Sequence, residues 1–161
     1  MRELSDRQLS HIRNKQIGFI FQGYNLIPEL TALENVELPL IYQGIGPGKR
    51  AQLAQEALER VGLGKRGGHR PTEMSGGQQQ RVAIARAIST HPPIIMADEP
   101  TGALDSKTGQ EVLAFLQQLN REGSTVILIT HDNGIAATAR RIVRVSDGKI
   151  VEDHEQEVDW L

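Results

Sequence analysis

Two hydrophobic periods alternate along this chain, and together they predict a mixed α/β fold. Apolar residues that recur every three or four positions predict helices at residues 5–14, 31–42, 49–61, 75–90, 107–121 and 133–139. Short continuous apolar runs predict buried strands at residues 17–21, 94–97 and 125–129, and a hairpin of residues 142–145 and 149–151. Because helices separate the strands, we expect a parallel sheet.

Capping and helix-breaking residues mark the limits of several of these elements. Thr31 and Glu34 have the spacing of a capping box at the start of a helix. Gly62 and the pair Pro92 and Pro93 are typical of helix ends. Loops are therefore expected at residues 44–48 and 64–71.

These elements suggest one domain with a helical middle. We expect a helical subdomain at residues 27–90, and an α/β core made of residues 1–26 and 91–152. Residues 153–161 form an acidic tail that we expect to be loosely held.

The amino-acid composition argues against several classes of function. The chain has 161 residues, 39% of them hydrophobic and 24% charged, as is ordinary for a single soluble globular domain. A net charge of -2 with scattered basic residues gives no reason to expect nucleic-acid binding. The absence of cysteine excludes disulfides and thiolate metal sites. The start of the sequence is not typical of a signal peptide, and no apolar run has membrane-spanning length, so any membrane spans would belong to another subunit.

A serine and two glycines open the helix predicted at residues 75–90. Backbone N–H groups and the positive helix end converge at Ser75, Gly76, Gly77 and Gln78, and the glycines would let a phosphate approach closely. The alternative is a plain capped helix start, which Ser-Gly-Gly alone would favour. The longer run from residue 74 to residue 87 argues for the anion site.

Polar residues follow the predicted strands at one sheet edge, where ligands of open α/β sheets bind. Asp98 could hold a magnesium shell, and its neighbour Glu99 could polarise an attacking water. His131 could contact a terminal phosphate or that water, and the amide oxygen of Gln22 could join the magnesium shell. Each has an ordinary alternative, such as an exposed acid, a structural histidine or a strand-end glutamine. Asp105 equally has a role as N-cap of the following helix.

The chain contains no phosphate-binding loop of the form G-x-x-x-x-G-K-[ST]. The segment from Gly44 to Arg50 is similar, but its glycine spacing is one residue short and Arg50 replaces the Ser or Thr. Pro47 also removes a backbone N–H that would face the phosphate. We interpret this segment as a surface loop.

In order and spacing, these motifs resemble those of ATP-binding cassette (ABC) ATPases, from about residue 4 to the tail. Phe21-Gln22 is similar to the Q-loop, Ser75–Gln78 to the signature, Asp98 and Glu99 to Walker B and the catalytic glutamate, Asp105 to the D-loop and His131 to the switch histidine. Further runs at residues 4–14, 25–36 and 97–105 resemble the MacB/LolD/FtsE-type branch, which is associated with macrolide efflux, lipoprotein release and related membrane work.

The resemblance implies a fold, an activity and partners. The fold would be a P-loop NTPase-like parallel sheet with a helical signature subdomain, here N-terminally truncated. Two cassettes would dimerise head to tail around two ATP molecules with Mg²⁺, each signature meeting the nucleotide of the other subunit. Glu99 would be the general base, with His131 and Gln22 organising phosphate, water and magnesium. Residues 25–35 would contact a transmembrane permease, so the protein would be cytoplasmic and peripheral on the inner face of the cell membrane.

The absence of a phosphate-binding loop from the sequence changes the ATPase activity that we expect. We expect no ATP hydrolysis by two such chains alone, and an exposed sheet edge with apolar surface around it. One alternative is a non-hydrolysing truncated cassette that acts as a binding or regulatory module. Another is the C-terminal lobe of a chromosome-maintenance or repair ATPase, which the Q-loop on the same chain and the lack of a coiled-coil repeat disfavour.

Overall fold

The computed structural model describes residues 5–158. Its helices are α1 (Asp6–Gln16), α2 (Ala32–Tyr42), α3 (Pro47–Arg60), α4 (Gly76–Ile88), α5 (Ser106–Arg121) and α6 (Asn133–Ala136). Its strands are β1 (Ile17–Phe21), β2 (Ile94–Asp98), β3 (Thr125–Ile129), β4 (Arg141–Ser146) and β5 (Lys149–Glu155). Short 3₁₀ turns lie at Gly64–Arg66 and Pro71–Glu73. Outside this range lie residues 1–4 of the predicted α/β core and residues 159–161 of the predicted tail.

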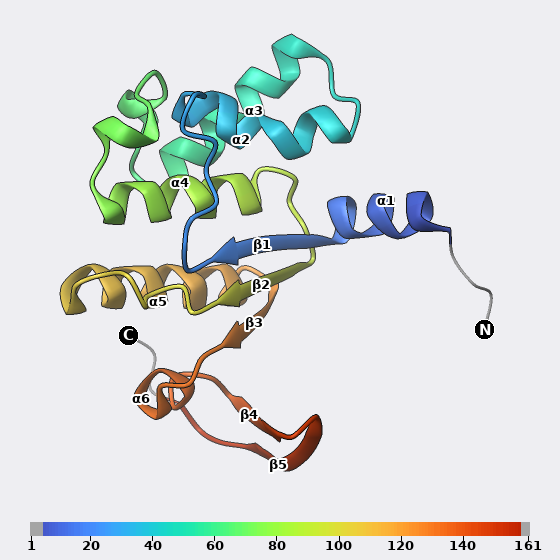
Figure 1. The fold of residues 1–161 in the computed structure, drawn as a ribbon, viewed down its shortest axis with the longest axis vertical. Helices are drawn as coiled ribbons and strands as arrows, with labels where there is room; N and C mark the ends of the chain where they lie inside the picture. Colours follow the sequence, from blue (N-terminus) through green and yellow to red (C-terminus); the bar gives the residue numbers. More distant parts are fainter. Residues whose placement is uncertain (1–4, 159–161) are drawn as a thin grey trace.

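A parallel sheet in the order β1-β2-β3 forms the centre, and β4 and β5 form a separate antiparallel hairpin, as the sequence predicts. Helices α2, α3 and α4 gather beside β1, α5 accompanies β2 and β3, and α1 extends outward from the start of β1 (Figure 1). In the register of the sheet, Phe21 lies opposite Asp98, and Asp98 lies opposite Ile129. The three strands therefore end in one row, and the residues that follow them share one edge.

Helix α4 lies unusually close to β1. A Cβ atom placed on Gly18 of β1 would be 2.4 Å from the carbonyl oxygen of Ala87 in α4, so only glycine fits there. Apolar residues of the sheet and of the helical layer then merge into one core. Its fully buried members include Ile20, Val36, Leu40, Leu58, Ile84 and Ile95.

Several predicted boundaries differ from the structure. Helix α3 begins at Pro47, inside the predicted loop, because proline is compatible with the first turn of a helix. Helix α6 ends at Ala136 rather than at residue 139. The reason is that the N–H groups of Thr138 and Ala139 donate to carbonyls three residues earlier, as in a 3₁₀ helix.

The acidic tail also begins later than expected. Strand β5 continues to Glu155, so residues 153–155 are paired with β4 instead of loosely held. The physical reason is electrostatic. Arg141 donates two hydrogen bonds to the carboxylate of Asp153, at 2.8 and 2.7 Å, and Arg144 forms an ion pair with Glu152 at 3.0 Å.

The expected exposed edge and apolar surface are present. Strand β3 is the last strand of its sheet, and the residues Ile127 and Ile129 are 42% and 46% exposed. Within residues 5–158, no helix has the length and apolarity needed to cross a bilayer.

The turn between β1 and α2 is organised by one buried amide. Asn35 is fully buried, and its Oδ1 accepts a hydrogen bond from the backbone of Ile27 at 2.8 Å. Its Nδ2 donates to the carbonyls of Ile27, Leu30 and Thr31. The predicted capping box of Thr31 and Glu34 is confirmed at the adjacent start of α2.

We therefore expect Asn35→Ala to destabilise the fold more than the loss of the neighbouring cap does. The substitution removes the four hydrogen bonds that this buried amide makes to the turn and should lower the free energy of unfolding by about 2–3 kcal/mol. Thr31→Ala, which removes only the cap, should cost about 1 kcal/mol. Urea denaturation of both variants measures the difference, and equal costs would show that the amide does not organise the turn.

Candidate functional site

Most of the predicted catalytic and metal-binding residues meet at the carboxyl edge of the parallel sheet. Gln22 directly follows β1, Asp98 ends β2 with Glu99 next to it, and His131 lies two residues beyond β3. Because the three strands end in register, these residues come together from segments far apart in the sequence. The sequence prediction of one shared edge is correct.

Glu99 is held in an unusual backbone conformation at this edge. Its φ is +43°, in the left-handed region that non-glycine residues rarely adopt. Its backbone N–H donates to the carbonyl of Ile129 at 2.9 Å, and its own carbonyl accepts from Gly102 at 3.1 Å. These bonds fix the direction in which the carboxylate leaves the chain.

The Glu99 carboxylate receives three hydrogen bonds. Oε1 accepts from the backbone N–H of His131 at 2.8 Å and contacts its ring Nδ1 at 2.6 Å, so this ring nitrogen carries the proton. Oε2 accepts from the hydroxyl of Thr130 at 3.2 Å. The Glu99 side chain is 19% exposed, whereas that of His131 is 90% exposed. The acid is therefore enclosed, and the imidazole faces outward.

This environment keeps Glu99 ionised. Partial burial raises the pKa of its carboxyl group, but the hydrogen bonds from the His131 ring and backbone, electrostatic attraction to His131 and the Thr130 bond outweigh that effect. The pKa of Glu99 lies below its ordinary value. A carboxylate of this kind accepts hydrogen bonds at neutral pH and cannot donate one.

Asp98, at the end of β2, and Gln22, directly after β1, carry side-chain oxygen atoms at the same edge of the sheet. Asp98 is exposed at the end of β2, and the Gln22 side chain packs on the backbone of Gly102, where an added Cβ would be 2.6 Å from Nε2. Among residues 5–158, no three His, Cys, Asp or Glu side chains gather into a metal-binding group. One carboxylate and one amide oxygen fit Mg²⁺, which usually keeps several waters and needs few protein ligands.

The signature residues form a second cluster, at the start of α4. Ser75 Oγ accepts from the backbone N–H of Gln78 at 3.3 Å, and Gln78 Oε1 accepts from the backbone N–H of Ser75 at 3.0 Å. This reciprocal capping box begins the helix and uses the Gln78 side chain. The backbone N–H groups of the first turn, including those of Gly76 and Gly77, are the donors that an anion would meet.

The two signature glycines also have packing roles that the sequence did not indicate. A Cβ on Gly76 would be 2.9 Å from the hydroxyl of Tyr24, and a Cβ on Gly77 would be 2.7 Å from Cγ2 of Thr108. Tyr24 belongs to the turn after Gln22. The signature therefore touches both the Gln22 turn and the start of α5.

Asp105 acts as the N-cap of α5, the structural role that the sequence analysis offered for it. Its Oδ1 accepts from the backbone N–H of Thr108 at 3.0 Å, and its Oδ2 accepts from the Thr108 hydroxyl at 2.6 Å. These bonds lower the pKa of Asp105. Through Thr108, this cap lies next to Gly77 of the signature.

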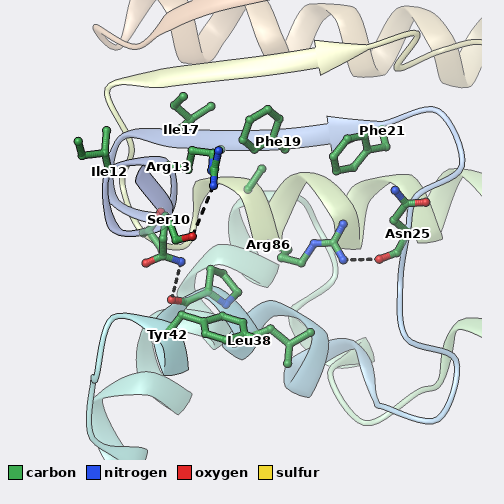
Figure 2. Close-up of a pocket in the computed structure, with 15 residues that line it drawn as sticks. Ser10, Ile12, Arg13, Ile17, Phe19, Phe21, Asn25, Leu38, Tyr42 and Arg86 are labelled. Carbon is green, nitrogen blue, oxygen red and sulfur yellow. Dashed lines mark hydrogen bonds between the residues drawn. The ribbon is translucent and has the colours of Figure 1, made fainter. Parts of the chain in front are cut away.

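Sequence reasoning missed Arg86, which fixes the turn after Gln22. Its guanidinium donates to the carbonyls of Asn25 at 2.5 Å and Tyr24 at 2.8 Å, and both of these residues have positive φ. Burial lowers the pKa of Arg86. Figure 2 shows Arg86 reaching from α4 to Asn25 at one end of an open cavity of about 1040 Å³. The sequence signal that could have identified Arg86 is a charged residue within the apolar pattern of α4.

Comparisons with known proteins agree with this geometry. The family model described as ABC transporter matches residues 1–102. The chain belongs to the ABC transporter family. It is 53% identical over 155 residues to a macrolide export ATP-binding/permease protein MacB of Bartonella quintana, covering 96% of this chain and 24% of that protein. It is 54% identical over 147 residues to an uncharacterized ABC transporter ATP-binding protein of Thermotoga maritima, covering 91% of this chain and 63% of that protein.

Solved structures of ABC cassettes have the same fold. A dimeric post-hydrolysis state of the ATP-binding cassette MJ0796, bound to ADP and Pi, superposes with a TM-score of 0.83 at 47% identity. The match covers 95% of this chain and 68% of that cassette. A dimeric structure of MJ0796, titled as a bacterial ABC transporter cassette, gives a TM-score of 0.83 at 50% identity. The predicted α/β ABC ATPase fold is therefore confirmed.

The lowered pKa of Glu99 predicts a pH dependence of stability in this ABC cassette. A folded-state pKa below the unfolded value stabilises the fold above the unfolded pKa, and this stabilisation disappears as the pH falls through the folded pKa. The difference in unfolding free energy between the wild type and Glu99→Gln should therefore shrink from about pH 5 downward. Urea titrations at several pH values measure it. The same comparison made in a His131→Ala background should show a weaker pH dependence, and an unchanged one would contradict the role of His131.

Arg86→Met should loosen the Gln22 turn of the cassette. The loss of two hydrogen bonds from a charged donor should lower the unfolding free energy by about 1–3 kcal/mol and speed amide hydrogen exchange at residues 22–25. Arg66→Met, at an exposed arginine that contacts His69, provides the control. If exchange at residues 22–25 rises equally in both variants, Arg86 does not hold the turn.

Proposed function

We propose that this chain is the ATP-binding and ATP-hydrolysing part of an ABC transporter that drives a membrane permease of the macrolide-efflux or lipoprotein-release type. The observation that carries the proposal is the Glu99 carboxylate, held ionised at the carboxyl edge of a parallel sheet by His131 and Thr130. The MacB relative, whose name joins an ATP-binding and a permease function, supports the permease assignment.

In this proposal Glu99 acts as general base. Its two oxygens have different neighbours: Oε1 accepts both bonds from His131, while Oε2 accepts only the longer bond from Thr130 among the described residues. Oε2 is therefore the oxygen available to take a hydrogen bond from the attacking water. His131, anchored through Nδ1, presents its exposed Nε2 to the terminal phosphate.

Asp98 and Gln22 would hold Mg²⁺, which supplies positive charge to the phosphates of ATP. The capped first turn of α4, at Ser75–Gln78, would serve the nucleotide bound by a second cassette, as the dimeric state of the MJ0796 structures supports. Asp105 would face the same interface. The segment 25–35 would contact the permease, so the cassette would be cytoplasmic and peripheral on the inner face of the membrane.

The proposal treats the chain alone as inactive. It contains no G-x-x-x-x-G-K-[ST] loop, and the backbone nest and lysine of that loop are the main cradle for the β- and γ-phosphates. A second candidate function follows from the same observation: a non-hydrolysing cassette that binds or regulates a partner. The repair-ATPase alternative is not favoured by the relatives, and a DNA-binding assay without response would remove it.

Glu99→Gln in the complete transporter should trap a closed, ATP-bound dimer. Glutamine keeps the shape of the side chain but cannot accept the proton of the attacking water, so turnover should fall by about a hundredfold or more. Size-exclusion chromatography with ATP and phosphate release measure the two effects. Glu56→Gln, at an exposed glutamate of α3, should leave both unchanged. Undiminished turnover in Glu99→Gln would refute the role of Glu99, and turnover by the 161-residue chain alone would refute the requirement for the missing loop.

A further inference from the structure

We propose that Gln80 is a positioning residue for Glu99, acting through the backbone of the loop that follows it. The inference rests on the proposed function, because it assigns Gln80 a part in the reaction of that same site. Gln80 lies in the middle of α4, six residues before Arg86, and its side chain is fully buried.

The Gln80 amide reaches the residue directly after Glu99. Nε2 of Gln80 donates to the carbonyl of Pro100 at 2.6 Å, across 20 residues of sequence. Pro100 is itself fully buried and has no backbone N–H, so its carbonyl is its only polar backbone group. The glutamine therefore holds the main chain one residue from the catalytic carboxylate.

This bond completes the set that defines the conformation of Glu99. On one side, the Glu99 N–H is bonded to Ile129 of β3, and on the other its carbonyl is bonded to Gly102. Between these two contacts, the chain turns through a left-handed residue, a conformation that needs surrounding support. The amide of Gln80 supplies this support from the helix that carries the signature.

The oxygen of the Gln80 amide shows that packing alone does not explain why a glutamine occupies this buried position. Its Oε1 is buried and has no hydrogen-bond partner among residues 5–158. A buried acceptor without a partner destabilises a fold, and an apolar side chain of the same length would avoid that cost. The useful contribution of the amide is its donated bond to Pro100.

The arrangement also links the two halves of the site within one chain. Helix α4 begins with the signature cluster at Ser75 and is joined to α3 and α5 through Arg81, which contacts the Val61 carbonyl at 3.2 Å and Glu111 at 2.5 Å. A shift of α4 would therefore be passed to Pro100, and from there to Glu99.

The first test measures ATP hydrolysis in the complete transporter. Gln80→Met keeps the length of the side chain and removes the donor, so kcat should fall about tenfold to a hundredfold while KM for ATP stays within about twofold. Gln117→Met is the matched control, because Gln117 is also buried and donates to a backbone carbonyl, that of Thr138, on a different part of the fold. It should leave kcat unchanged.

A double-mutant comparison separates positioning from general damage. In a Glu99→Gln background, single-turnover hydrolysis should lose little more when Gln80→Met is added, because the group that Gln80 positions is already disabled. An equal loss in both backgrounds, or an unchanged kcat in the single variant, would overturn the proposal. If Gln80→Met does not fold, Gln80→Asn, whose amide is one methylene short of Pro100, is expected to give the same result.

The second test does not depend on hydrolysis. In the 161-residue chain, Gln80→Met should speed amide hydrogen exchange at Glu99 and Gly102. The N–H of Glu99 is bonded to the carbonyl of Ile129, and the N–H of Gly102 to the carbonyl of Glu99. The control variant Gln117→Met should leave the exchange rates of both amides unchanged. Unchanged exchange in Gln80→Met would refute the inference even if the transporter hydrolyses ATP. Conversely, a wild-type transporter without ATPase activity would refute the proposed function, while this measurement would still decide whether Gln80 holds the loop.

Discussion

Helix α4 approaches the sheet at a distance that only a glycine in β1 permits, with Gly18 against the carbonyl of Ala87. From this position the helix sends polar side chains to the surrounding segments: Gln80 to Pro100, Arg81 to Val61 and Arg86 to the turn after Gln22. Each of these bonds ends on a backbone carbonyl. The helix therefore fixes the path of the main chain around it, and a change in its distance from β1 would disturb all three segments together.

The carboxyl edge of the sheet depends on a different balance, between burial and hydrogen bonding at one carboxylate. Glu99 leaves a strained backbone position, and both of its oxygens are bonded to the residues that follow β3. Burial alone would favour the protonated acid, and the donors from His131 and Thr130 reverse this preference. The parallel register makes this possible, because it places the ends of β2 and β3 side by side.

Local sequence signals predicted much of this architecture. The apolar runs predicted the three parallel strands, and the three-residue spacing of Thr31 and Glu34 predicted the capping box at the start of α2. The roles of Arg86 and Gln80 could not be predicted, because their partners lie 61 and 20 residues away and are backbone carbonyls of any residue type. The pairing of residues 153–155 was missed for a related reason: it depends on the register with Arg141 across the hairpin.

The outer side of β3 has a consequence for how copies of this chain behave in solution. Within residues 5–158 its backbone groups on that side face no neighbouring strand, and Ile127 and Ile129 flank them with exposed apolar surface. Such a row is a template onto which a strand of another molecule can add. A net charge of -2 provides little repulsion between copies. This edge is therefore a route by which copies of the chain can associate, and covering β3 would close that route.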